Sequence, residues 1–224
     1  MRNRFRRFLI AAAVLLAAFN IVYFSALRSW HMRWGATDSE VNAPLPGDDL
    51  LAGAQAGVTH AVTINAPPDK IWPWLMQIGQ DRGGFYSYTP LENLIGCEMP
   101  KVERIVPQWL PRRVGETVWF ATPRHYHGTA KMIAGVVRPD RAFVMVTPAD
   151  WERLQAGLRG QEGTWGFTLQ PVAAGQTRLI ARGRGLPAKT FGTRMANLFF
   201  WEPAHFVMER KMLLTIKRLA ENNS

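Results

Sequence analysis

Several common chemical signatures are missing from this sequence of 224 residues. Its one cysteine, Cys97, has no partner for a disulfide within the chain, and without a Cys-x-x-Cys pair it is expected to be a packed thiol. The sequence also has no Gly-x-Ser-x-Gly elbow, no His-Glu-x-x-His pair and no phosphate-binding glycine loop ahead of a helix. The sequence patterns of the best-marked hydrolases, zinc peptidases and nucleotide-binding proteins are therefore absent.

Acidic residues are absent from the first 35 positions, where six arginines lie. The whole chain has 27 basic and 17 acidic side chains, so the remaining positions hold 21 basic residues against 17 acidic ones. The strong positive balance is therefore mostly a property of the N-terminus. Arg178, Arg182 and Arg184 alternate along a predicted strand and are expected on its solvent face, so no nucleic-acid partner is predicted.

The N-terminus contains a long apolar run. Residues 8–27 are 20 consecutive residues without a charged side chain. A helix that rises ~1.5 Å per residue over this length spans the ~30 Å hydrocarbon core of a bilayer. Arginines flank the run on both sides: Arg2, Arg4, Arg6, Arg7, Arg28 and Arg33. The run predicts a single N-terminal transmembrane helix, with the lipid bilayer as its partner.

Two other interpretations of this run are a cleaved signal peptide and a buried core helix. The apolar stretch is longer than a typical signal sequence, and Ala26-Leu27-Arg28 is a poor cleavage site. A core helix is usually shorter and is not bounded by arginines at both ends. We therefore favour an uncleaved anchor. More arginines precede the run than follow it, which predicts a cytoplasmic N-terminus and a main domain outside the cytoplasm.

The chain divides into three parts on this evidence. Residues 1–33 are the predicted membrane anchor with its basic flanks, residues 34–57 a linker rich in proline, glycine and acidic residues, and residues 58–221 one folded domain. The linker is expected to lie on the surface of the domain and not to form part of its core. About 160 residues suffice for a domain with a real hydrophobic core.

Within the domain, the pattern predicts a strand, two short helices, a series of antiparallel strands and a long terminal helix. Along residues 203–221, Met208, Met212, Ile216 and Leu219 recur on one apolar stripe, and Glu209 is expected mostly on the other side. Further helices are expected at about 70–78, 90–95, 150–158 and 191–200, and a break between the last of these and the terminal helix is expected at Glu202-Pro203. Strands are predicted at 59–64, 102–106, 117–122, 129–138, 142–147, 163–171 and 177–184.

Four stretches carry a resemblance to a known family: WGATDSEV (34–41), INAPPDKIWPWLMQIGQDRGGFYSY (64–88), LENLIG (91–96) and EPAHFVMERKMLLTIKRLAE (202–221). They resemble the START-like or SRPBCC superfamily, which includes pollen-allergen-like and polyketide-cyclase-like proteins, and in particular its membrane-anchored bacterial members. The resemblance covers roughly residues 58–221. It implies an α+β helix-grip fold, in which a curved antiparallel sheet wraps around the C-terminal helix and leaves an apolar cavity. It also implies binding of lipid-like or other apolar molecules, with enzymes in the minority.

Aromatic and methionine side chains are the predicted ligand contacts, because they suit ligands of little polarity. Each of them has core packing as the alternative role. The candidates are Trp72, Phe85, Tyr86, Tyr88, Trp119, Tyr126, Trp165, Phe167, Phe206 and Met208. We expect a membrane-anchored protein that binds a small hydrophobic or amphipathic ligand. The alternatives are a polyketide cyclase or dehydrase using the same pocket, and a structural protein whose pocket is filled by tryptophans.

Histidines and glutamates offer weaker candidates. His125 and His127 form an i, i+2 pair without a nearby third ligand, so neither a metal site nor a cofactor is predicted. His205 is expected to form surface pairs along its helix. Glu92, Glu98 and Glu103 are candidates for a buried acid or base near the pocket mouth, with solvated surface roles favoured. No catalytic residue is assigned.

Overall fold

The computed structural model describes residues 2–53 and 55–222. Within these residues the centre of the molecule is a six-stranded antiparallel sheet in the order β1-β6-β5-β4-β3-β2. The strands are β1 (Gln55–Ile64), β2 (Thr117–Trp119), β3 (Lys131–Arg138), β4 (Ala142–Val146), β5 (Gly163–Ala173) and β6 (Gln176–Gly185). Apart from the stretch 102–106, each predicted strand is present.

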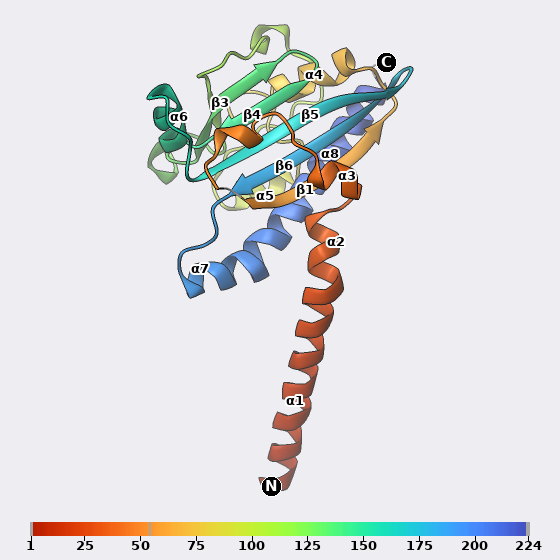
Figure 1. Ribbon diagram of the computed structural model, residues 1–224, viewed down its shortest axis with the longest axis vertical. Coiled ribbons are helices and arrows are strands. Elements are labelled where there is room, and N and C mark those ends of the chain that lie inside the picture. The colour runs from red at the N-terminus through yellow and green to blue at the C-terminus, as the bar shows by residue number, and fades with distance from the viewer. Residues whose placement is uncertain (1, 54, 223–224) are drawn as a thin grey trace.

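The long helix α8 (Glu202–Asn222) lies across one face of the sheet (Figure 1). Its predicted apolar stripe faces the strands, because Met212, Ile216 and Leu219 are buried there. The inner face of the sheet supplies Phe143, Phe167 and Leu179 to the same core. Helix α4 (Pro68–Met76) packs on α8, and α5 (Thr89–Leu94) follows it. This arrangement confirms the predicted α+β helix-grip fold.

Residues 34–53 of the predicted linker lie against the opposite face of the sheet, where α3 (Asp38–Asn42) and the short 3₁₀ turn η2 (Asp48–Leu50) run in front of the strands (Figure 1). Residues 55–57 already belong to β1. Ion pairs fasten this segment to β6. Arg178 bonds to Glu40 at 2.6 Å, and Arg182 to Asp48 at 2.7 Å. The expectation that these arginines face solvent was wrong, because the segment covers them and leaves only 6% of Arg182 exposed.

The predicted strand at 102–106 is also wrong. The backbone of this stretch forms hydrogen bonds with the side chain of Gln77. The amide nitrogen of Gln77 donates to the carbonyl of Arg104, and its amide oxygen accepts from the N–H of Val106. These bonds replace strand pairing. The remaining short elements of the region are the 3₁₀ turns η3 (Pro107–Trp109) and η4 (Tyr126–Gly128), and α6 (Pro148–Gln155) between β4 and β5.

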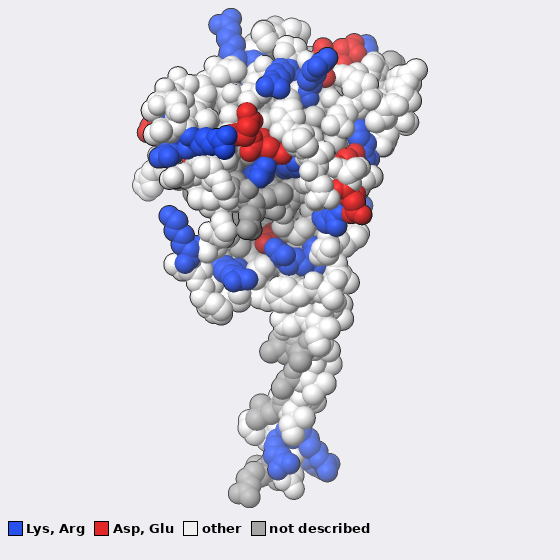
Figure 2. Space-filling model, in the orientation of Figure 1, with Lys and Arg blue, Asp and Glu red and all other residues white. Residues whose placement is uncertain are grey.

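At the N-terminus, α1 (Arg2–Val22), the π-helical turn η1 (Tyr23–Leu27) and α2 (Arg28–Met32) follow one another as one rod that projects from the domain (Figure 1). Large apolar side chains are exposed along it, among them Phe8, Leu15 and Phe19. Basic side chains gather at its free end (Figure 2). No helix in the described part of the chain meets the length and hydropathy of a membrane span, so the predicted transmembrane helix is not found on that criterion.

The rod is joined to the domain beside the start of α8. There, α7 (Phe191–Ala196) and a second π-helical turn, η5 (Asn197–Trp201), lead directly into α8. The Tyr23 hydroxyl donates to the carbonyl of Leu198, and Arg28 forms a two-bonded ion pair with Glu202 at 2.8 and 3.0 Å. The predicted helix break at Pro203 is absent. Pro203 has no backbone N–H to donate, but it follows the π turn directly, where the regular i to i−4 hydrogen bonds of the helix are already interrupted.

Candidate functional site

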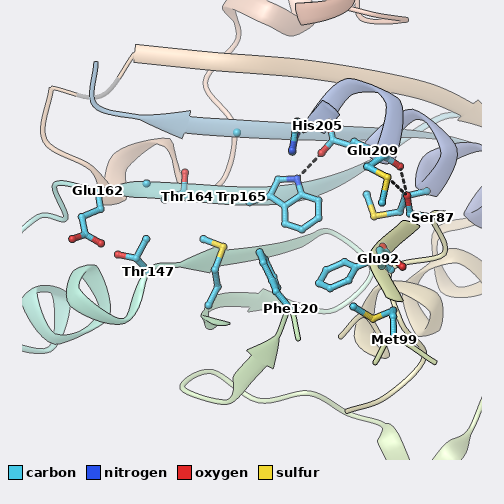
Figure 3. Close-up of a pocket in the computed structure, with 16 residues that line it drawn as sticks. Ser87, Glu92, Met99, Phe120, Thr147, Glu162, Thr164, Trp165, His205 and Glu209 are labelled. Atoms are coloured by element: carbon cyan, nitrogen blue, oxygen red, sulfur yellow. Dashed lines mark hydrogen bonds and ion pairs between the residues drawn. The ribbon is translucent and has the colours of Figure 1, made fainter. Parts of the chain in front are cut away.

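A cavity of about 500 Å³ lies between the sheet and α8. Its wall is mostly aromatic and sulfur-containing, with a few polar side chains among them (Figure 3). The lining residues are Phe85, Ser87, Glu92, Met99, Phe120, Met132, Thr147, Glu162, Gly163, Thr164, Trp165, Gly183, His205, Met208, Glu209 and Met212. The size is typical of a small-molecule pocket, which is mostly apolar with a few placed polar groups.

Three aromatic rings form a continuous part of this wall. Phe85 meets Phe120 edge to face with ring centres 4.8 Å apart, and both rings lie 5.8 Å from the ring of Trp165. They come from the loop after α4, the end of β2 and the inner face of β5. Contacts of this kind hold rings in fixed orientations, so the wall is a preformed apolar surface.

Glu209 of α8 is the polar centre of the cavity. Only 2% of the residue is exposed, and Trp165 Nε1 donates to its Oε1 at 2.5 Å (Figure 3). Its Oε2 bonds to Nδ1 of His60 on β1, and Nε2 of His205 lies 3.5 Å away. Burial alone raises a carboxyl pKa, but His205 and His60 outweigh burial here and hold the pKa of Glu209 well below its usual range.

The two histidines around Glu209 have different surroundings. Nε2 of His60 lies 2.6 Å from the carbonyl of His31, which can only accept, so this nitrogen carries a proton and donates. Its Nδ1 forms a hydrogen bond with Oε2 of Glu209. His205 lines the cavity and is partly exposed; burial lowers its pKa, but the Glu209 carboxylate outweighs burial and raises it. The cavity therefore contains a charged His–Glu centre.

Glu92 of α5 is the second acidic group in the wall. It is 8% exposed, and its Oε2 is buried without a hydrogen-bond partner in the described part of the chain. Burial raises the pKa of Glu92 to about 7. Glu92 can therefore give or take a proton near neutral pH, or bind a cation.

The structure places three of the predicted ligand contacts, Phe85, Trp165 and Met208, on the cavity wall. Phe167 lies in the solid core, with its ring 5.1 Å from that of Trp165. Phe206 packs instead against Trp30, at 5.1 Å between ring centres.

The other predicted contacts lie away from this cavity. Tyr86 and Tyr88 line a separate, more polar depression beside α8, and Trp72 packs on the edge of the core. Trp119 stacks under the Lys131 ammonium, and Tyr126 is 46% exposed in the turn η4. Aromatic composition alone did not distinguish cavity wall from core and surface.

Sequence reasoning missed the polar centre of the site. Glu209 was expected on the polar side of α8 and is buried, and its i, i+4 pair with His205 lines a cavity instead of the surface. A signal was available, because Glu209 is three residues before Met212 and seven before Ile216, which places it on the apolar stripe. Glu92 was considered as an acid or base, but a solvated role was favoured; the structure buries it.

The remaining candidates lie at the surface. Glu98 pairs with His125 at 3.2 Å, and Glu103 pairs with Arg218 at 3.0 Å. His125 and His127 belong to a tight turn and not to a strand. Among the described residues, no three histidine, cysteine, aspartate or glutamate side chains are grouped as a metal site would require.

Comparisons with known proteins give only distant likenesses. No family model and no curated protein matches the sequence. A polyketide-cyclase-like protein from Corynebacterium glutamicum is 16% identical, with 76% of this chain and 92% of that chain covered and a TM-score of 0.36. Norcoclaurine synthase from Thalictrum flavum is 14% identical, with 74% and 86% covered and a TM-score of 0.37.

The Aha1 dimer from Colwellia psychrerythraea gives a similar likeness, 16% identical with 71% and 96% covered and a TM-score of 0.37. The structural neighbours thus include one polyketide-cyclase-like protein, and none of the three is described as membrane-anchored. At these low scores, the likeness assigns the chain neither a family nor an activity.

Proposed function

We propose that this protein binds a small, mostly apolar molecule in the cavity under α8. The observation that carries the proposal is the cavity itself: about 500 Å³ of space, walled by rings and methionines from the sheet, the α4–α5 region and α8. Apolar contact stabilises such a complex by about 25 cal/mol per Å² of buried surface before ordering costs are subtracted. A cavity filled by tryptophans, which would indicate a structural role, is not what the lining residues form.

The test uses the full chain, because α2 contributes to the buried surroundings of Glu209 through the His31 carbonyl. The protein is purified in lipid nanodiscs and examined by native mass spectrometry for bound or exchangeable apolar molecules across a broad lipid panel. The variant Met132→Trp places a large ring in the cavity wall and is expected to reduce ligand occupancy about tenfold or more.

Val172→Trp is the matched control, because Val172 is 55% exposed on β5 outside the cavity lining, and it should retain the ligand. Absence of any ligand across the panel would contradict the proposal. So would full occupancy in a folded Met132→Trp protein.

We also propose that residues 8–27 attach the protein to a bilayer, with the N-terminus in the cytoplasm and the domain outside it. Three observations support this: the uncharged run, the exposed apolar side chains along the projecting rod, and the basic residues at its free end (Figure 2). An apolar ligand is concentrated near a membrane, so attachment would bring the cavity close to its supply of ligand.

A second candidate function is an enzyme of the polyketide cyclase or dehydrase kind. It is favoured by one observation: Glu92 and the His205–Glu209 pair are polar groups with shifted pKa values on the wall of one cavity. Incubation with a panel of poly-β-ketone thioesters, followed by mass spectrometry for products that have lost one water, tests it. No such product above the level given by Glu92→Gln would count against catalysis.

A further inference from the structure

The charged groups on the cavity wall are almost all acidic. Glu92, Glu162 and Glu209 line the cavity together with one histidine, His205, and the described lining contains neither lysine nor arginine. Electrostatic complementarity sets which partner a site accepts. A ligand with a carboxylate or phosphate would meet no lysine or arginine on this wall.

Two of these carboxylates do not select a ligand. Glu209 already has Trp165, His60 and His205 around it, so its negative charge is compensated within the protein. Glu162 is exposed, and solvent screens its charge. The hydroxyl of Ser87 donates to the Met208 carbonyl at 2.9 Å and is likewise in use (Figure 3).

Glu92 differs from both. More than nine-tenths of the residue is buried, and its Oε2 has no hydrogen-bond partner among the described residues. Glu92 shares the cavity wall with apolar side chains that include Met99 and Phe120 (Figure 3). An unpaired buried carboxylate is costly unless an opposite charge or donor reaches it.

We propose that the cavity selects an apolar molecule that carries a basic amine, whose ammonium group donates to the carboxylate of Glu92. This inference rests on the proposed function and names the chemical class of its ligand. The aromatic and methionine wall takes the apolar part, and Glu92 supplies the missing counter-charge. A fatty acid of the same size is disfavoured, because its carboxylate would lie near that of Glu92, while the lining histidine His205 is already paired with Glu209.

The experiment compares three probes with one carbon skeleton: phenylbutylamine, phenylbutanol and phenylbutyrate. Binding of each to the full chain in detergent is measured by isothermal titration calorimetry at neutral pH, with micelle blanks subtracted. The amine is expected to bind about tenfold or more tighter than the alcohol, because charge-assisted hydrogen bonds are stronger than neutral ones, and the acid weakest. In Glu92→Gln, the preference of the amine over the alcohol should disappear while alcohol binding remains.

Glu152→Gln removes a carboxylate from the exposed face of α6 and should leave the preference unchanged. Equal binding of amine and alcohol by the unaltered protein would overturn the amine inference and leave the apolar-ligand proposal standing. A preference that persists in Glu92→Gln would overturn it as well. Failure of all three probes to bind would overturn both.

Discussion

Glu92 and Glu209 are two buried carboxyls in one cavity whose surroundings drive their pKa values in opposite directions. Burial acts on both and disfavours the charged form. Glu209 has two histidines that outweigh this effect, whereas burial is the one resolved cause for Glu92. Glu209 is thus kept ionised and binds its neighbours in the cavity wall. Glu92 titrates near neutral pH and is available to exchange a proton or to bind a ligand.

The raised pKa of Glu92 predicts how stability depends on pH. Its pKa rises from 4.5 to about 7 on folding, so the folded state holds a proton that the unfolded state has lost between these values. Stability from this group is therefore present below about pH 4.5 and is lost as the pH rises through about 7. Glu92→Gln has no proton to lose, so the variant should gain about 1–3 kcal/mol relative to the unaltered protein between about pH 5 and pH 8.

Urea denaturation of both proteins at the two pH values measures this difference. The raised pKa of His205 also makes the folded state less stable as the pH rises, because the histidine then loses its proton. Both proteins contain His205, so its effect cancels in the difference between them. Glu152→Gln should follow the unaltered protein. A stability difference between Glu92→Gln and the unaltered protein that stays constant over this range would contradict the assigned pKa.

At the scale of elements, the connection from α6 to β5 depends on one side chain. The carboxylate of Asp150 is fully buried and accepts from the backbone N–H groups of Gln161, Glu162 and Gly163 at 2.5, 2.9 and 2.9 Å. Gln161 and Glu162 lead into β5, which begins at Gly163, and Glu162 and Gly163 line the cavity. A single side chain therefore sets where the strand that holds Trp165 begins.

Replacement of Asp150 by alanine is expected to leave these backbone donors without their acceptor, at a cost of about 2–4 kcal/mol in the free energy of unfolding. Asp150→Asn keeps one acceptor oxygen and should lie between the two proteins. Chemical denaturation gives the midpoints. If Asp150→Ala unfolds at the same denaturant concentration as the unaltered protein, the turn has another source of stability.

Elements were predicted well where the hydrophobic period was clear, and poorly where bonding was not local. The alternation of β5 and the stripe of α8 identified the sheet and its helix in advance. The 102–106 stretch failed because its partner is Gln77, a side chain far away in the sequence. The site was predicted only in its apolar part, because the carboxyls and histidines that meet in it come from β1, α5 and α8, and no local pattern shows that they converge.

At the scale of the whole molecule, the protein is a domain on a rod. If the rod is a membrane anchor in the proposed orientation, a reporter fused after Ser224 will be active outside the cytoplasm. Alkaline phosphatase and green fluorescent protein fusions, compared in a bacterial host, measure this, since the first is active outside and the second inside. Replacing Arg2, Arg4, Arg6 and Arg7 by glutamate should weaken or reverse the orientation, because cytoplasmic flanks retain basic residues.

A cytoplasmic readout from the unaltered fusion would contradict the orientation. Recovery of the full chain in the soluble fraction, without detergent, would contradict attachment itself. The matched control is Arg113→Glu, which changes an exposed arginine of the domain and should leave the topology unchanged.

The junction of rod and domain joins two π-helical turns. The Tyr23 hydroxyl donates a hydrogen bond to the Leu198 carbonyl. Arg28 forms two hydrogen bonds with the carboxylate of Glu202, the first residue of α8. His205 lies about one helical turn after Glu202, and Glu209 one turn after His205. Both residues line the cavity. The rod and the polar centre of the cavity are thus attached to the same end of one helix, the rod through Glu202 and the polar centre through His205 and Glu209.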